Sequence, residues 1–415
     1  MSNGDEHWPL ELNYEKVRPL GRGAFGIVWL ARSKDSDASE EKCVTSPTYV
    51  AIKQIHASNE EEAEYARREI DILSEIRHPN IVRCLQSVKL GSIWLVVLTL
   101  ARGPNLGDLI RAGGALNISL ARLAARHLIS AVSYLHSRGV IHRDLKPDNC
   151  ILVKNKAAYE VESKIDWMSN DALWDDSIVF TDEWRVVLVD FGFARALTPK
   201  QVGLEHNSSR RPSVGTLVHR VIAENAKNEP EKSIRKSRPI KTQPSFQKLR
   251  HALSSIGTRQ FAAPEVQRAR RKSKRDNALS PYVADYGLVS EAYSCGATIK
   301  MILTGVPAGD NETAFRYSVL GSILASVCGC RSKDNRKRKK RYKFLDETPK
   351  QAQELIRKML KVDESERLTV PSARAEPWIA GGIDSNDPVI ELPAGDYPTG
   401  IDDPISCLKC AERCC

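Results

Sequence analysis

The spacing of apolar residues changes near residue 103, and this change most constrains the fold. Before it, the sequence predicts one helix over 59–77 and short strands over 17–20, 27–30, 49–55, 81–85 and 92–100. After it, apolar residues at helical spacing predict helices over 119–139, 290–304 and 349–361. A strand-rich part followed by a helical part predicts an α+β chain of two lobes, with a hinge near Thr99–Gly103.

Basic charge is concentrated in segments that interrupt this pattern. The formal net charge is +10, but residues 198–256 hold 12 Lys and Arg against 4 Asp and Glu, and residues 331–343 hold 9 against 1. Residues 155–183, 197–255 and 381–415 are polar or rich in Ser, Pro and Gly, so we expect insertions or tails that are at least partly disordered. The remaining chain is near neutral, which argues against a uniformly basic nucleic-acid binder.

The termini and cysteines indicate a cytoplasmic protein, with nuclear or peripheral membrane location left open. Residues 1–17 are acidic and lack the apolar stretch of a secretory signal. The longest apolar run, 93–100, is far shorter than the ~20 residues of a membrane span. Six of the ten cysteines are scattered, which suggests reduced, buried thiols.

A glycine-rich stretch, GRGAFGIV, begins at Gly21. Gly21, Gly23 and Gly26 would let backbone amides approach phosphate oxygens, because no Cβ stands in the way. A dinucleotide-binding turn would continue into a helix, whereas this stretch continues into an apolar strand. The pattern therefore favours a hairpin over the phosphates of a nucleotide.

Charged residues at strand ends suggest phosphate and metal binding. Lys53 lies in the apolar strand VAIK, and a buried ammonium needs a carboxylate, for which Glu69 in the following helix is the candidate. Asp190 follows the apolar strand VVLV and precedes Phe-Gly, which suits a Mg²⁺ ligand, and Asn149 offers a second oxygen.

Taken in order, the motifs GRGAFGIV, VAIK, RREI, HRDLKPDN, DFG, GTRQFAAPE and ERLT resemble those of eukaryotic protein kinases of the serine/threonine type. The resemblance covers roughly residues 14–380. It implies a small antiparallel-sheet N-lobe over 14–101, a larger helical C-lobe over 102–380, and ATP between them. Residues 1–13 would be an N-terminal extension and residues 381–415 a tail.

The resemblance also implies roles for single residues. Asp144 would accept the proton of the acceptor hydroxyl, and Lys146 would neutralise charge on the transferred phosphoryl group. Asn149 and Asp190 would hold Mg²⁺. The implied ATP-binding residues are Leu20, Gly21, Gly23, Gly26, Val28, Ala51, Lys53, Glu69, Leu98, Thr99, Ala101 and Ile151. Thr258 would lie in the substrate loop, and Glu265 would form a structural ion pair with Arg367.

Two features depart from the family pattern or predict regulation. Glu291 stands where the family has an aspartate that anchors the HRD loop, so we expect a displaced anchor and weakened activity. Arg143 and the long segment from Asp190 to Glu265 predict control by phosphorylation from an upstream kinase. The candidate phosphosites are Ser254, Ser255, Ser213 and Ser273, each of which could equally be an unmodified surface serine.

Substrate preference and the basic and cysteine-rich segments stay open. Asp148 could attract a basic substrate residue, but Asn105 stands where Arg-directed kinases often place an acid. For the run RKRKKR over 336–341, a solvated loop is the first reading, and nuclear import or attraction to anionic membrane or nucleic acid are the alternatives. Cys407, Cys410, Cys414 and Cys415 suit lipidation and membrane association better than zinc, with a plain thiol-bearing tail as the default.

We therefore expect an active ATP-dependent protein serine/threonine kinase with MgATP as its phosphoryl donor. The alternative is a kinase-fold scaffold with weak or no turnover. Retention of Lys53, Asp144 and Asp190 favours the enzyme. Nucleic-acid binding is disfavoured, because the basic segments lack interleaved aromatic residues.

Overall fold

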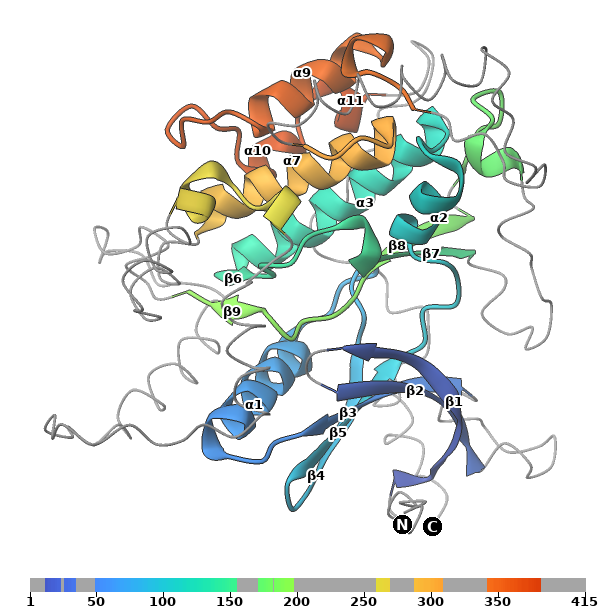
Figure 1. Ribbon diagram of the computed structural model, residues 1–415, viewed down its shortest axis with the longest axis vertical. Coiled ribbons are helices and arrows are strands. Elements are labelled where there is room, and N and C mark those ends of the chain that lie inside the picture. The colour runs from blue at the N-terminus through green and yellow to red at the C-terminus, as the bar shows by residue number, and fades with distance from the viewer. Residues whose placement is uncertain are drawn as a thin grey trace, which may run out of the picture.

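The computed structural model describes residues 12–23, 26–34, 49–154, 171–181, 183–197, 259–268, 287–308 and 342–381. These residues form an α+β fold of two lobes (Figure 1). The N-lobe holds an antiparallel sheet in the order β1-β2-β3-β5-β4. Its strands are β1 (Tyr14–Gly23), β2 (Gly26–Ser33), β3 (Tyr49–His56), β4 (Cys84–Leu90) and β5 (Ile93–Thr99).

Helix α1 (Glu60–Glu75) packs beside this sheet. The side chain of Asn59 caps it by accepting a hydrogen bond from the Glu62 amide at 2.9 Å, and glutamates in its first turn suit the positive end of the helix dipole. Its buried face carries Glu69, Ile70 and Leu73. The predicted helix is therefore confirmed, with ends one or two residues shorter.

The register of the sheet places four predicted site residues on one face. Val28 pairs with Lys53, and Ala51 pairs with Leu98. Since Ala51 and Lys53 are two residues apart on β3, their side chains point the same way, as do those of their cross-strand partners. The nucleotide-facing residues predicted from the sequence thus share one surface of the N-lobe.

The C-lobe is built mainly of helices packed around α3 (Figure 1). Its helices are α2 (Leu106–Gly113), α3 (Ile118–Ser137), α7 (Leu288–Thr304), α9 (Lys350–Met359), α10 (Val370–Ala373) and α11 (Pro377–Ala380). Its short strands are β6 (Val140–Ile141), β7 (Cys150–Lys154), β8 (Trp184–Leu188) and β9 (Arg195–Ala196), paired β6 with β9 and β7 with β8. In the described residues, no helix is both long and apolar enough to cross a membrane.

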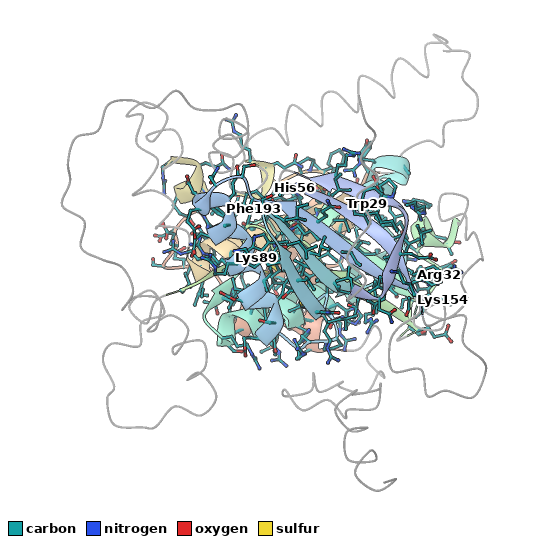
Figure 2. The ribbon with its side chains drawn as sticks, turned by 90° about the horizontal axis from the view of Figure 1, so that it is seen from below. Trp29, Arg32, His56, Lys89, Lys154 and Phe193 are labelled. Atoms are coloured by element: carbon teal, nitrogen blue, oxygen red, sulfur yellow. The ribbon has the colours of Figure 1, made fainter. Side chains whose placement is uncertain are left out.

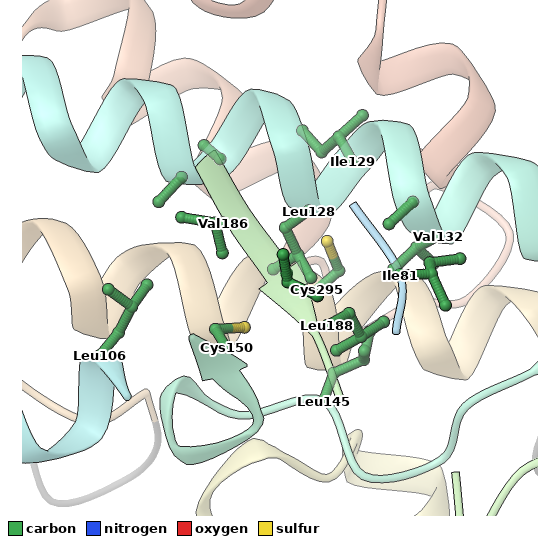
Figure 3. Close-up of a cluster of buried hydrophobic side chains, with 14 of the residues drawn as sticks. Ile81, Leu106, Leu128, Ile129, Val132, Leu145, Cys150, Val186, Leu188 and Cys295 are labelled. Carbon is green, nitrogen blue, oxygen red and sulfur yellow. The ribbon is translucent and has the colours of Figure 1, made fainter. Parts of the chain in front are cut away.

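One hydrophobic core joins the lobes. In the C-lobe, Leu128 of α3, Cys150 of β7, Leu188 of β8 and Cys295 of α7 pack together (Figure 3). The same cluster continues into the N-lobe through Leu73 and its neighbours on α1. The buried, free thiols of Cys84, Cys150 and Cys295 agree with the expectation of reduced cysteines.

Residues 80–82 link the lobes, which corrects one predicted strand. We expected a strand over 81–85, but β4 begins at Cys84. Instead, Asn80 Nδ2 donates to the Val186 carbonyl at 3.0 Å, and the Val82 amide donates to the Leu188 carbonyl at 3.0 Å. The apolar residues after His78 are therefore buried against β8 of the C-lobe. Helix α2, which has only eight residues, was not predicted.

Residues 171–181 are folded onto the C-lobe, within a segment, 155–183, that we expected to be an insertion at least partly disordered. Leu173, Trp174 and Phe180 are buried. The Phe180 amide donates to Ser119 Oγ at 2.9 Å. A Cβ at Gly113 would collide with the Trp174 indole, so these rings pack directly on the end of α2. The apolar residues that lie among polar ones in this segment could have indicated its packing from the sequence.

We expect Trp174→Ala to lower the free energy of unfolding by about 3 kcal/mol, because it leaves a cavity between the inserted segment and α2. Val179→Ala is the matched control in the same segment. Val179 is 61% exposed, so its truncation should change stability by less than about 0.5 kcal/mol. Chemical denaturation monitored by circular dichroism measures both. Equal effects of the two substitutions would contradict the packing described here.

Two partly buried histidines, His78 after α1 and His127 on α3, predict a pH dependence of stability. Burial lowers the pKa of His78 to about 4 and that of His127 to about 3, with nearby arginines adding to the effect. Between pH 6.5 and 5 the unfolded chain therefore binds more protons at these positions than the folded chain. Stability should be full above pH 6.5 and fall as the pH drops, by on the order of 1 kcal/mol per pH unit for each histidine.

Unfolding titrations at pH 7, 6 and 5 test this slope. The His78→Gln/His127→Gln double variant should show a flatter dependence, whatever its stability at pH 7. An unchanged slope in the double variant would assign the effect to other groups.

Candidate active site

Lys53 forms the centre of a buried ionic cluster. Its Nζ donates to Glu69 Oε1 at 2.6 Å and to Asp190 Oδ1 at 3.1 Å. Burial opposes the charge on Lys53, but Asp190 and Glu69 outweigh it and raise the Lys53 pKa above its usual value. The Lys53 ammonium in turn lowers the pKa of Asp190 to about 2. Lys53 and Asp190 are therefore charged at neutral pH, whereas burial raises the pKa of Glu69 against the opposing effect of Lys53. The three side chains join β3, α1 and the C-lobe.

The second part of the site is the loop HRDLKPDN. Asp144 is buried, and its Oδ2 accepts from Lys146 Nζ at 2.6 Å and from Asn149 Nδ2 at 3.0 Å. Asn149 Nδ2 also donates to the Asp144 carbonyl at 2.8 Å. Because its amide nitrogen is engaged in this way, the Asn149 side chain keeps its carbonyl oxygen for another partner.

Hydrogen bonds and ring packing hold this loop against the strand that leads to Asp190. The Val189 amide donates to the Asn149 carbonyl at 2.9 Å, and His142 Nε2 lies 3.1 Å from the Val189 carbonyl. The His142 ring meets Phe191 edge to face, with centroids 4.8 Å apart. Asp190 itself is in the left-handed region at φ +62°, a conformation that a non-glycine residue keeps only when its surroundings fix it.

Glu291 anchors the catalytic loop from α7. Its Oε1 accepts from the amides of His142 at 2.8 Å and of Arg143 at 2.7 Å, while its Oε2 lies 2.9 Å from His136 Nε2. The expected displacement of the anchor is therefore wrong. The longer side chain reaches both loop amides and also contacts His136, which sequence reasoning missed because no local pattern near His136 indicates this role.

Only one of the three glycines in the glycine-rich hairpin occupies a position that no other residue could take. Gly26 has φ +146°, and a Cβ there would collide with the Gln54 carbonyl. At Gly21 and Gly23 nothing lies within 4 Å of an added Cβ. A side chain at Gly21 or Gly23 would thus meet open space, so only Gly26 of the three is required by its own packing.

Apolar residues from both lobes meet at the predicted adenine site. Ala51 and Leu98 belong to the buried core that joins the lobes, and Val28, Ala101 and Ile151 pack against it. Leu20 is 41% exposed on β1. At the end of β5, the Thr99 amide donates to the Arg83 carbonyl at 2.9 Å, which fixes the start of the hinge.

Glu265 and Arg367 form the ion pair that the resemblance implied. Arg367 donates to Glu265 Oε1 at 2.7 Å and Oε2 at 3.0 Å, and Ser290 Oγ donates to the same carboxylate at 2.9 Å. Although burial opposes it, Arg367 lowers the pKa of Glu265. This pair touches none of the residues around Lys53, so its role is structural.

Several predicted residues lie outside the described residues. They are Thr258, Ser213, Ser254, Ser255, Ser273, Cys407, Cys410, Cys414, Cys415 and the basic run 336–341.

The anchor at Glu291 gives a direct test. Glu291→Ala would leave two buried backbone amides without their acceptor, which should cost about 3 kcal/mol or more in stability. Glu291→Gln keeps an acceptor oxygen and should lose clearly less. Thermal unfolding compares the two. Equal losses would mean that the amides of His142 and Arg143 do not depend on this side chain.

Part of the chain matches a known protein family and its members. Residues 14–218 match the family model described as "Protein kinase domain". The chain is 36% identical over 148 residues to serine/threonine-protein kinase PkaA of Streptomyces coelicolor, an alignment that covers 35% of this chain and 27% of the relative. It is 39% identical over 145 residues to CBL-interacting serine/threonine-protein kinase 19 of Arabidopsis thaliana, covering 34% and 28%.

A third relative is serine/threonine-protein kinase nekl-2 of Caenorhabditis elegans, 30% identical over 158 residues that cover 36% of this chain and 43% of the relative. The chain thus matches less than half the length of each of these relatives. The matched region holds Lys53, Glu69, Asp144 and Asp190, and Glu291 contacts it through His136, His142 and Arg143. Residues 14–218 thus form a protein kinase domain by their match to this family model, and the relatives that the chain resembles are named serine/threonine-protein kinases.

Proposed function

We propose that this chain is an ATP-dependent protein serine/threonine kinase that transfers the γ-phosphoryl group of MgATP to Ser or Thr hydroxyls of protein substrates. The observation that carries the proposal is the Lys53 cluster, in which one ammonium contacts both Glu69 and Asp190. The two carboxylates fix the position of the lysine and keep it charged, so its ammonium can also bind phosphate oxygens.

The residues present fit a nucleotide and Mg²⁺. Mg²⁺ in phosphoryl-transfer sites is held by one or two protein side chains together with substrate phosphates, and otherwise keeps water ligands. Asp190, whose side chain is 43% exposed, and the side-chain oxygen Oδ1 of Asn149 would supply such a small oxygen set. In the described part of the chain, no cluster of three or more His, Cys, Asp or Glu side chains offers a self-contained metal site. Bound Mg²⁺ would supply positive charge next to the phosphates.

The protein's own residues would position the acceptor and balance charge. Asp144 would orient the acceptor hydroxyl and take its proton, since its carboxylate is buried but held by Lys146 and Asn149. Lys146, which is part-buried, would offset negative charge that moves toward the acceptor oxygen. Glu291 would keep both in place through the loop amides. No feature of the described residues favours the scaffold alternative once Glu291 is seen to hold the loop.

Regulation by phosphorylation fits a group of arginines near α1. Arg68 Cζ lies 5.4 Å from the Tyr65 ring centroid, and the charges of Arg68, Arg143 and Arg195 oppose the burial that raises the Tyr65 pKa. Such a group suits an added phosphate of about −1.5 to −2 charge. We propose that a phosphoserine of the long segment, with Ser254 and Ser255 as candidates, binds there after modification by an upstream kinase. Membrane association through the C-terminal cysteines and a cytoplasmic location are proposed on the sequence alone.

Asp144→Asn and Lys53→Met should each reduce phosphoryl transfer from labelled ATP by roughly 10²-fold or more, because one removes the proton acceptor and the other the phosphate ligand. The substrates are a generic basic protein and a mixed Ser/Thr peptide library.

Lys89→Met is the matched control. Lys89 is exposed on β4 of the sheet, with its Nζ 5.0 Å from the Trp94 ring centroid (Figure 2), and this change should leave activity near the wild-type value. Equal label in wild type, Asp144→Asn and Lys53→Met would remove the enzyme proposal.

A further inference from the structure

A chain of four polar side chains lies directly beside the catalytic loop. Asn105 Nδ2 donates to Asp108 Oδ2 at 2.6 Å. Arg111 Nη2 donates to Asp108 Oδ1 at 2.6 Å, and its Nη1 donates to Asp148 Oδ1 at 2.7 Å. One guanidinium thus bridges two carboxylates from different parts of the chain.

The backbone fixes this arrangement. Asn105 caps α2 by accepting from the Asp108 amide at 2.7 Å, and Asp108 and Arg111 lie one turn apart on that helix. Asp148 comes from the short 3₁₀ helix Pro147–Asn149. A Cβ at Gly107 would lie 2.7 to 2.9 Å from the Asp148 carboxylate, so the absence of a side chain at Gly107 lets this carboxylate rest on the first turn of α2.

The bridge shares a loop with Asp144, so under the proposed function a polypeptide that reaches Asp144 would pass near it. Asp148 stands two residues after Lys146 and next to Asn149, within the same loop as Asp144. A substrate whose hydroxyl reaches Asp144 places its neighbouring residues at intervals of about 3.3 Å along an extended backbone. The side chains of Asp148, Asp108 and Arg111 are 36%, 50% and 54% exposed, so a substrate side chain can reach them.

We infer that Arg111 is a specificity-determining residue, an internal counter-ion that prevents Asp108 and Asp148 from selecting basic substrate residues. The inference rests on the proposed kinase function. Without Arg111, two exposed carboxylates would face the substrate and attract Lys or Arg beside the acceptor. With Arg111 in place, an incoming cation must displace a guanidinium tethered one helical turn away, which competes at high effective concentration. The wild-type protein therefore tolerates basic residues near the acceptor but does not require them.

The test compares kcat/KM for matched peptides that carry either Ala or Arg at each position flanking one serine. For Arg111→Ala, we expect a roughly three- to tenfold gain in preference for Arg over Ala at one or two positions, the range expected of one or two exposed ion pairs. Arg111→Lys keeps the charge and should retain the wild-type preference. The Arg111→Ala/Asp148→Asn double variant should lose most of the gain.

Arg67→Ala is the matched control, because Arg67 also pairs with carboxylates, Glu60 and Glu64, on the exposed face of α1. It should leave the peptide preference unchanged. Fluorescence anisotropy of labelled Ala and Arg peptides, measured on the same proteins, gives the comparison without turnover.

The outcomes separate this inference from the proposed function. If Arg111→Ala phosphorylates the Ala peptide normally but gains no preference for Arg, the inference is overturned and the kinase function stands. A change in the KM for ATP with no change in peptide preference would assign Arg111 to the nucleotide and also overturn it. If wild type phosphorylates no peptide, the proposed function fails. A gain in affinity for Arg peptides on Arg111→Ala would then still support the counter-ion role, and equal affinities would reject it.

Discussion

The contact of Lys53 with Glu69 and Asp190 is the interaction on which the rest of the structure depends. It joins β3 of the N-lobe, helix α1 of that lobe and the loop that leaves β8 in the C-lobe. Three charges are buried or half-buried at one point, which is costly unless each is paired. Here each is paired, and the two carboxylates hold the lysine between the sheet of the N-lobe and the loop after β8.

Contacts from several parts of the C-lobe hold residues around the site in unfavourable backbone conformations. Arg143 and Asp190 both have positive φ angles, at 69° and 62°. Glu291 holds the amide of Arg143, and residues beside Asp190 are bonded to the Asn149 carbonyl and packed on His142. A residue on a central buried helix thus fixes a strained loop. The same reasoning explains why a glutamate serves here, since its second oxygen is used by His136.

Much of the fold and of the candidate site could be predicted from the sequence, because strong local signals mark them. The cap at Asn59, the apolar spacing of α3 and the order of the motifs place most elements and the Lys53, Asp144 and Asp190 groups. The exceptions are set by long-range contacts. Residues 80–82 join β8 and not the sheet, Trp174 packs on α2, and Arg111 pairs with Asp148 across 37 positions. None of these partners is near in sequence, so no local pattern could indicate them.

The most direct test of the account is the Mg²⁺ dependence of ATP binding, measured by titration calorimetry on wild type and Asp190→Asn. The account predicts that Mg²⁺ strengthens ATP binding to wild type and that Asp190→Asn loses most of this gain, because Asp190 supplies the charged oxygen ligand. ATP affinity that is equal with and without Mg²⁺ in both proteins, or the lack of any ATP binding by wild type, would contradict it.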